Sequence, residues 1–316
     1  MTMPDAARSG PPSRPGPSPE SGDPAALRSG LLRLAVWTAV LAVCFCRPLI
    51  ELARYAWQSE IYSYILLVPF ISGALLRWSR RQLPARLEPA PGWALVSLAA
   101  GLGVLGGYWL TVRTGWRPPV EEYLSLMTLS FGLLALSAAF GWLGMPILRQ
   151  AAFPIGLLLC ALPLPGAWLS WLEGFLQHGS ADAAHVLFAL AGMPLLRQDT
   201  VFQLPGFTLQ VAPECSGIHS TLALFITSLV AGYVSLNSPW RRAVLSLAVI
   251  PLAVLRNGFR IFTIGQLCVH VSPNMIHSAL HRRGGPLFFA LSLVPFCLLL
   301  FLLRRGEVSR LSSCPK

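Results

Sequence analysis

Long apolar stretches recur along this chain, and they restrict its possible folds more than any other feature. The stretches run to roughly 17–25 residues, the length that an α-helix needs to cross ~30 Å of hydrocarbon. Hydrophobic residues make up 54% of the 316 and charged residues only 12%, about half the charge content of a typical soluble domain. Too few polar side chains remain to cover a water-facing surface, so the sequence predicts an all-α, polytopic membrane helix bundle.

We expect about eight transmembrane helices in this bundle. The predicted spans cover residues 31–52, 61–76, 93–112, 124–147, 151–164, 216–236, 243–267 and 286–303. Residues 1–30 are rich in Pro, Ser, Gly and Ala and bury too little apolar surface to fold, which predicts a disordered cytoplasmic tail. The expected organisation is therefore this tail, a transmembrane domain over 31–303 and a short cytoplasmic tail over 304–316.

A more polar segment, residues 165–214, separates the fifth and sixth predicted spans. It begins with an amphipathic stretch that contains Trp168 and Trp171, and such a mixture of aromatic and polar side chains suits a short interfacial helix. It ends at residues 201–211, where apolar and polar residues partly alternate around Pro205 and Gly206. That pattern predicts a short hairpin just before the sixth span.

Arginine placement orients the bundle, because cytoplasmic connections of membrane proteins carry an excess of basic residues. Arginines crowd the connections after the second and sixth spans and the C-terminal tail: Arg77, Arg80, Arg81, Arg86, Arg241, Arg242, Arg304, Arg305 and Arg310. Both termini are then cytoplasmic, and the 165–214 segment faces outward. The net charge of +11 has this topological explanation, so we expect the lipid bilayer and no nucleic acid as a partner.

Cys215, at the outward-facing start of the sixth span, is a candidate nucleophile. Unpaired backbone N–H groups and the helix dipole stabilise a thiolate at that position. The alternative is a small buried side chain without a catalytic role. Glu214 and Ser216 beside it are both able to cap the same helix, and Ser216 is a weaker alternative nucleophile.

Arg256, Asn257 and Arg260 lie within the seventh apolar run. The two arginines are four residues apart and therefore share a helix face. A guanidinium at this depth is able to orient a carbonyl group or stabilise a developing oxyanion. The alternative is that one arginine extends to the membrane interface.

Three histidines, His219, His277 and His281, are candidates for a general base that serves the thiol. Binding of a metal is the competing hypothesis, but the sequence contains no HExxH motif and no Cys-x-x-Cys spacing. We therefore expect no metal and no cofactor. Residue chemistry alone does not choose among the three histidines.

Three short motifs resemble those of the exosortase/archaeosortase family of polytopic membrane enzymes. They are Cys215-Ser216-Gly217, Asn257-Gly-Phe-Arg260 and His281-Arg-Arg-Gly-Gly285, and their order and spacing agree with the family. Further similarity lies in Leu162-Pro-Leu-Pro165 and in the segment 62–69, so the resemblance covers roughly residues 57–301.

The resemblance implies a membrane-embedded cysteine protease or transpeptidase that cleaves a C-terminal sorting signal, of the PEP-CTERM kind, on exported proteins. Cys215 is then the nucleophile that forms a thioester, His281 the base and acid, and Arg260 the electrostatic stabiliser. The implied location is the inner membrane, with the site facing outward and envelope polysaccharide machinery as a further partner. Many relatives have Arg in place of His219 and Ser-His-Gly in place of residues 63–65, which points to a divergent subfamily.

Two other functions compete with this interpretation. A transporter or permease could line a path with the same arginines and histidines, but it predicts inverted repeats, and the sequence has no internal repeat. A non-enzymatic assembly factor for envelope polysaccharide would tolerate the loss of Cys215.

Overall fold

The computed structural model describes residues 24–79, 87–211, 216–272 and 285–312. Six helices within these ranges are long and apolar enough to cross a membrane, or seven if one bent pair is counted as a single span. The six are α1 (Pro24–Cys44), α4 (Pro91–Arg113), α5 (Val120–Trp142), α9 (Ile218–Ser235), the continuous stretch of α10 (Pro239–Leu247) and α11 (Val249–His270), and α13 (Gly285–Ser312). The all-α polytopic bundle is confirmed, whereas the number eight is not.

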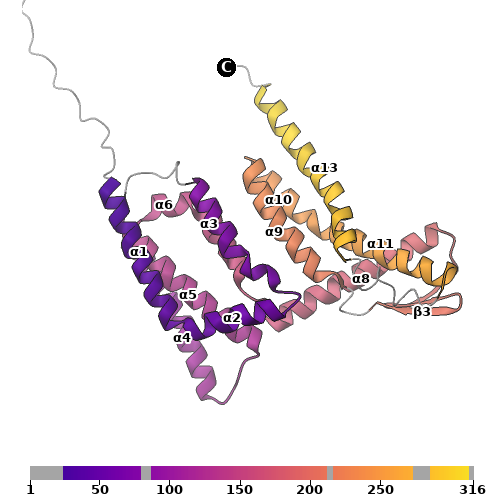
Figure 1. The fold of residues 1–316 in the computed structure, drawn as a ribbon, viewed down its shortest axis with the longest axis horizontal. Coiled ribbons are helices and arrows are strands. Elements are labelled where there is room, and N and C mark those ends of the chain that lie inside the picture. Colours follow the sequence, from indigo (N-terminus) through magenta and orange to yellow (C-terminus); the bar gives the residue numbers. More distant parts are fainter. Residues whose placement is uncertain (1–23, 80–86, 212–215, 273–284, 313–316) are drawn as a thin grey trace, which may run out of the picture.

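The first predicted span, 31–52, ends early because the chain changes direction at Phe45. Helix α1 stops at Cys44, and α2 (Cys46–Gln58) runs at an angle to it (Figure 1). Pro48 lacks the N–H that would bond the carbonyl of Cys44 in a continuous helix, so a break at this point costs little. Polar residues follow, including an ion pair of 3.0 Å between Arg47 and Glu51. The prediction from hydropathy therefore treated parts of α1 and α2 as one span.

The second and fifth predicted spans are also shorter than a membrane crossing. The second is divided between η1 (Ser63–Leu66) and α3 (Val68–Ser79). The fifth is α7 (Ala152–Leu157) with η3 (Leu158–Ala161), preceded by α6 (Met145–Gln150). The stretch from α7 to η3 bends by 90° into α8 (Gly166–Leu190). Pro163 and Pro165 cause the bend, since proline cannot continue a helix and keeps the residue before it extended.

Helix α8 occupies the position of the predicted interfacial helix, but it is not short, because it extends over 25 residues. A three-stranded antiparallel sheet follows it, formed by β1 (Leu196–Gln198), β2 (Val201–Leu204) and β3 (Phe207–Gln210). The hairpin predicted at 201–211 is β2–β3, and it turns at Pro205 and Gly206. Gly206 has φ of +74°, the conformation that this turn requires. Strand β1 was not predicted, because it is only three residues long and lacks apolar alternation.

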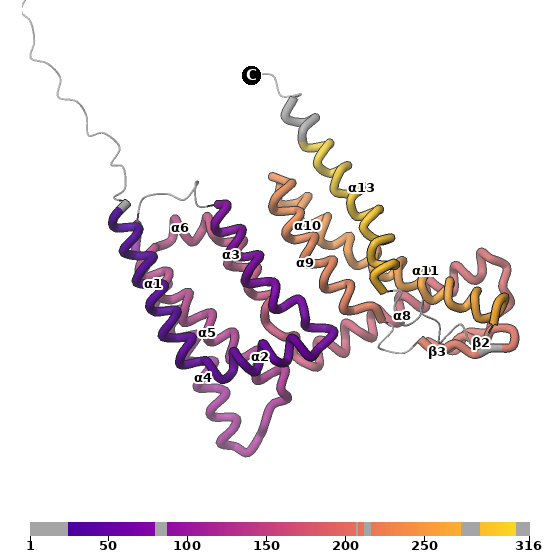
Figure 2. Tube along the Cα trace, viewed as in Figure 1, coloured from indigo at the N-terminus to yellow at the C-terminus, as the bar shows by residue number. Residues whose placement is uncertain are grey.

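The sheet lies beside the C-terminal ends of α8 and α11 (Figure 2). Its inner face joins both helices in one apolar cluster: Ala181, Ala184, Phe188, Phe202, Leu204, Leu209, Val211 and Ile261. Helix α11 comes close to α8 because it carries Gly258 and Gly265 at the contact. A Cβ at Gly258 would lie 2.6 Å from Cβ of Ala183, and one at Gly265 would lie 2.5 Å from Cζ of Phe188. Small residues permit this close packing between membrane helices.

The start of α1 and the end of α13 lie at the same end of the molecule (Figure 1). Both helices extend beyond their predicted spans, α1 back to Pro24 and α13 on to Ser312. The remainder of the two predicted tails lies outside the described residues. Six spans would place these two ends on one side of a membrane, whereas seven would place them on opposite sides.

Candidate active site

The turn that leads into α9 is built by Ser216 and Gly217. Gly217 has φ of +72°, in the left-handed region that only glycine adopts without strain. The neighbouring helix α11 leaves no space there: a Cβ at Gly217 would lie 2.9 Å from Nη2 of Arg256 and 3.4 Å from Oδ1 of Asn257. The glycine of the Cys-Ser-Gly motif therefore serves two purposes, the turn itself and the close approach of α11.

Arg256 is buried, with 8% of its surface exposed. Its Nη2 donates to the carbonyl oxygen of Gly217 at 3.1 Å and to Oγ1 of Thr221 at 3.3 Å. Thr221 in turn donates to the same carbonyl at 2.8 Å. These bonds fix the guanidinium against the first turn of α9, a contact between residues 39 apart in the sequence.

Asn257 and Arg260 complete the second motif on α11. Asn257 is almost fully buried, at 2% exposed, and its side-chain amide faces Gly217. Arg260 lies one helical turn beyond Arg256 and is partly exposed. The structure therefore brings the first part of the Asn-x-x-Arg motif against the last part of the Cys-Ser-Gly motif.

His219 lies on the first turn of α9 and is exposed. Its Nε2 is 3.4 Å from Oγ of Ser63, at the start of η1. His219 departs from the pattern that the resemblance suggested, whereas Ser63 keeps the serine of that pattern and is followed by the two residues that depart from it, Tyr64 and Ile65. The contact therefore joins the segments that contain the two departures.

Four of the predicted site residues, Glu214, Cys215, His277 and His281, lie outside the described residues. Their predicted roles stay predictions. Cys215 is bonded directly to Ser216, so the contact between Gly217 and Arg256 lies two residues from it. Among the residues that the structure describes, no group of three or more His, Cys, Asp or Glu side chains is arranged to hold a metal.

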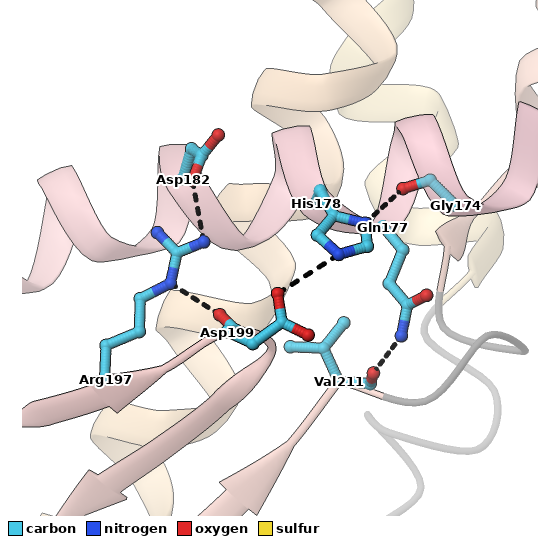
Figure 3. A network of polar contacts seen from close by, with 7 residues as sticks. All are labelled: Gly174, Gln177, His178, Asp182, Arg197, Asp199 and Val211. Atoms are coloured by element: carbon cyan, nitrogen blue, oxygen red, sulfur yellow. Dashed lines mark hydrogen bonds and ion pairs between the residues drawn. The ribbon is translucent and has the colours of Figure 1, made fainter.

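A polar network fastens the sheet to α8, close to this site (Figure 3). Nε2 of Gln177 donates to the carbonyl oxygen of Val211 at 2.6 Å. Val211 is buried and is the last described residue before Cys215. Gln177 therefore holds the strand that leads into the Cys-Ser-Gly motif. It was not predicted as a site residue, because a lone glutamine in an amphipathic helix gives no sequence signal.

Charged contacts extend this network along the exposed side of α8 (Figure 3). Arg197 pairs with Asp182 at 2.7 Å and donates through Nε to the carbonyl oxygen of Asp199 at 2.7 Å. The ring nitrogens of His178 lie 2.7 Å from the carbonyl oxygen of Gly174 and 3.1 Å from Oδ1 of Asp199. The network therefore joins α8 to the turn between β1 and β2.

These features define a multi-pass membrane protein with a buried polar site where the first turn of a spanning helix meets an arginine of another. The model of the transmembrane exosortase family (Exosortase_EpsH) matches residues 56–298, more than half of the chain. The protein therefore belongs to the transmembrane exosortase family, whose members are membrane-embedded transpeptidases of protein sorting. No curated protein and no solved structure matches the chain.

Proposed function

We propose that the protein is a cysteine transpeptidase that cleaves a C-terminal sorting signal from exported proteins. The contact of Gly217 with Arg256 and Asn257 carries this proposal, since it joins two of the three family motifs at one point in space. The family match supports the same class of enzyme. It also weighs against a transporter, for which the sequence offered no repeat.

In the proposed reaction His281 takes the proton of the Cys215 thiol, and Sγ attacks the carbonyl carbon of the scissile peptide bond. The C–N bond then breaks, His281 returns the proton to the departing amine, and a thioester remains on Cys215. Arg260 stabilises the negative charge that develops on the carbonyl oxygen. An amine or hydroxyl acceptor resolves the thioester by transfer, and water resolves it by hydrolysis. We favour transfer, because a site at the membrane surface admits little water.

The proposed substrates are exported proteins whose signal has a short motif, an apolar helix and a basic tail, as in PEP-CTERM proteins. The proposed location is the inner membrane, with both termini cytoplasmic and the site facing outward. The arginine clusters support this orientation, and so does the position of α1 and α13 ends on one side of the molecule. Envelope polysaccharide machinery is a proposed further partner.

The proposal is tested by replacing the nucleophile. Cys215→Ala and Cys215→Ser should abolish processing of a tailed reporter protein while the variants still insert into the membrane. Cys297→Ala, on an exposed face of α13, is the matched control and should process at the parental rate. Hydroxylamine added during turnover should yield a hydroxamate at the new C-terminus of the reporter, detected by mass spectrometry. Parental processing by Cys215→Ala would overturn the thiol mechanism.

The histidine assignment has its own test. Removal of a general base typically lowers a rate by ~10²–10⁴-fold, so His281→Ala should be far slower than His277→Ala or His219→Ala. Equal losses at His277 and His281 would mean that the family motif does not identify the base.

A further inference from the structure

Two buried polar atoms at the candidate site, on residues far apart in the sequence, have no hydrogen-bond partner in the described part of the chain. Among the described residues, four buried side-chain atoms have no hydrogen-bond partner: Oγ of Ser72, Oγ of Ser180, Oγ of Ser216 and Nη1 of Arg256. Ser72 and Ser180 are single hydroxyl groups inside helices α3 and α8. Ser216 and Arg256 are linked instead, because Arg256 is hydrogen-bonded to Gly217, the residue after Ser216. The turn at Ser216 and Gly217 and the guanidinium packed against it therefore each carry an open donor.

Arg256 also lacks a counter-charge within the described part of the chain. The ion pairs found there join Arg47 with Glu51, His178 with Asp199 and Arg197 with Asp182. A buried cation without a carboxylate is expensive, because the desolvation penalty is several kcal/mol per ion. A guanidinium has five N–H donors, and the described contacts of Arg256 use only those of Nη2. Such a group is well suited to an oxygen acceptor that arrives with a ligand.

The guanidinium of Arg256 is held in place before any ligand binds, and Ser216 is enclosed by its neighbours. Nη2 of Arg256 is held by Gly217 and Thr221, and Ser216 is 1% exposed in the turn before α9. Donors that are already oriented stabilise a developing negative charge without reorganisation, which is the basis of an oxyanion hole. Ser216 directly follows Cys215 in the sequence, so the two donors belong to the segment of the proposed nucleophile and to the helix packed against it.

We propose that Nη1 of Arg256 and Oγ of Ser216 form an oxyanion site that binds the carbonyl oxygen of the peptide bond attacked by Cys215. This inference rests on the proposed function. Arg256 lies outside the three family motifs, and Ser216 lies within Cys-Ser-Gly without an assigned role. The two arginines then act differently: Arg256 donates a fixed N–H, and Arg260, one turn away and partly exposed, contributes its charge.

The test measures turnover of a signal peptide and inhibition by a peptidyl aldehyde of the same sequence. The aldehyde adds the Cys215 thiol to its carbonyl carbon, so its oxygen occupies the proposed site. Ser216→Ala and Arg256→Gln should each lower kcat by ~10²-fold, the usual cost of one oxyanion-hole donor, and should weaken aldehyde inhibition. Thr227→Val removes an exposed hydroxyl from the same helix, which donates to the carbonyl oxygen of Ala223, and should retain parental values.

Alkylation of Cys215 by iodoacetamide separates the two proposals, because that reaction develops no charge on a carbonyl oxygen. The Ser216 and Arg256 variants should be alkylated at the parental rate.

Parental kcat and aldehyde inhibition in Ser216→Ala would overturn the oxyanion site and leave the thiol mechanism standing. Activity in Cys215→Ala would overturn the thiol mechanism itself. Arg256→Lys keeps the charge but loses Nη1, so full activity in that variant would also contradict the site. Ser216→Ala removes only one oxygen atom, so this variant should fold and still tests the site if an Arg256 variant does not fold.

Discussion

Two arginines are buried at opposite ends of the α9–α11 region, and their surroundings differ. Arg241, 4% exposed, donates through Nη1 to the carbonyl oxygen of Leu303 at 2.9 Å and through Nη2 to that of Gly306 at 2.8 Å. The ring of Trp240 lies 5.4 Å from its guanidinium carbon. Arg256 uses one terminal nitrogen and leaves the other without a partner among the described residues. Arg241 thus joins helices with both terminal nitrogens bonded, whereas Arg256 keeps one nitrogen open, as the proposed oxyanion site requires.

The largest expected difference follows from replacing each arginine with an amide. Arg241→Gln should reduce stability, because each lost hydrogen bond to a charged group costs about 1.5–3 kcal/mol, but folded molecules should keep parental turnover. Arg256→Gln should show the opposite pattern, with turnover reduced by ~10²-fold. Thermal unfolding in detergent gives the stability, and titration of Cys215 with an alkylating probe counts the folded molecules. Equal losses of turnover per folded molecule would remove the distinction between the two arginines.

An effect of intermediate size is expected from substitution of two glycines, of which only one contacts Arg256. Gly217 and Gly206 have φ of +72° and +74°, so alanine at either position carries a similar backbone strain of about 1–2 kcal/mol. Only Gly217 has a neighbour, since nothing lies within 4 Å of a Cβ built at Gly206. Gly217→Ala should therefore also displace Arg256 and lower kcat, while Gly206→Ala should lower thermal stability alone. A parental kcat in Gly217→Ala would show that the position of Arg256 is unimportant.

The smallest effect is expected in the exposed network on α8. Asp199→Asn removes the ion pair with His178, whose side chain is 54% exposed, and exposed pairs contribute about 0–1 kcal/mol. Asn also tolerates the φ of +55° at this position. Unfolding temperature and turnover should both stay near the parental values, and any difference should disappear at high salt. A loss of turnover as large as that of Arg256→Gln would instead place this network in the catalytic machinery.

Much of the fold could be predicted, because a membrane-spanning helix needs a long apolar run and hydropathy measures that directly. Spans such as 93–112 and 243–267 correspond to α4 and to the α10–α11 stretch. Hydropathy does not show where a helix breaks or the chain changes direction, however. The break at Phe45 and the bend at Pro163 and Pro165 were therefore missed, and the predicted number of eight spans is not confirmed by the six or seven found in the described residues.

The candidate site could be predicted only in part. The motif order indicated which segments would meet, and Gly217 does lie against Arg256 and Asn257. The free hydrogen-bonding capacity of Ser216 and Arg256 could not be predicted, because it depends on what every neighbouring group already binds. The same holds for Gln177, whose role depends on the carbonyl group of a residue 34 positions away.

The two close contacts of α11 with α8 have a mechanical consequence. Gly258 and Gly265 lie about two helical turns apart. Close contact with α8 at both points restricts rotation of α11 about its own axis. A roll of about 10° would move a guanidinium at the helix periphery by roughly 1 Å. A misplacement of that size costs on the order of 10²-fold in rate. The alignment of Arg256 with the turn at Gly217 thus depends on the Cβ atoms that Gly258 and Gly265 lack.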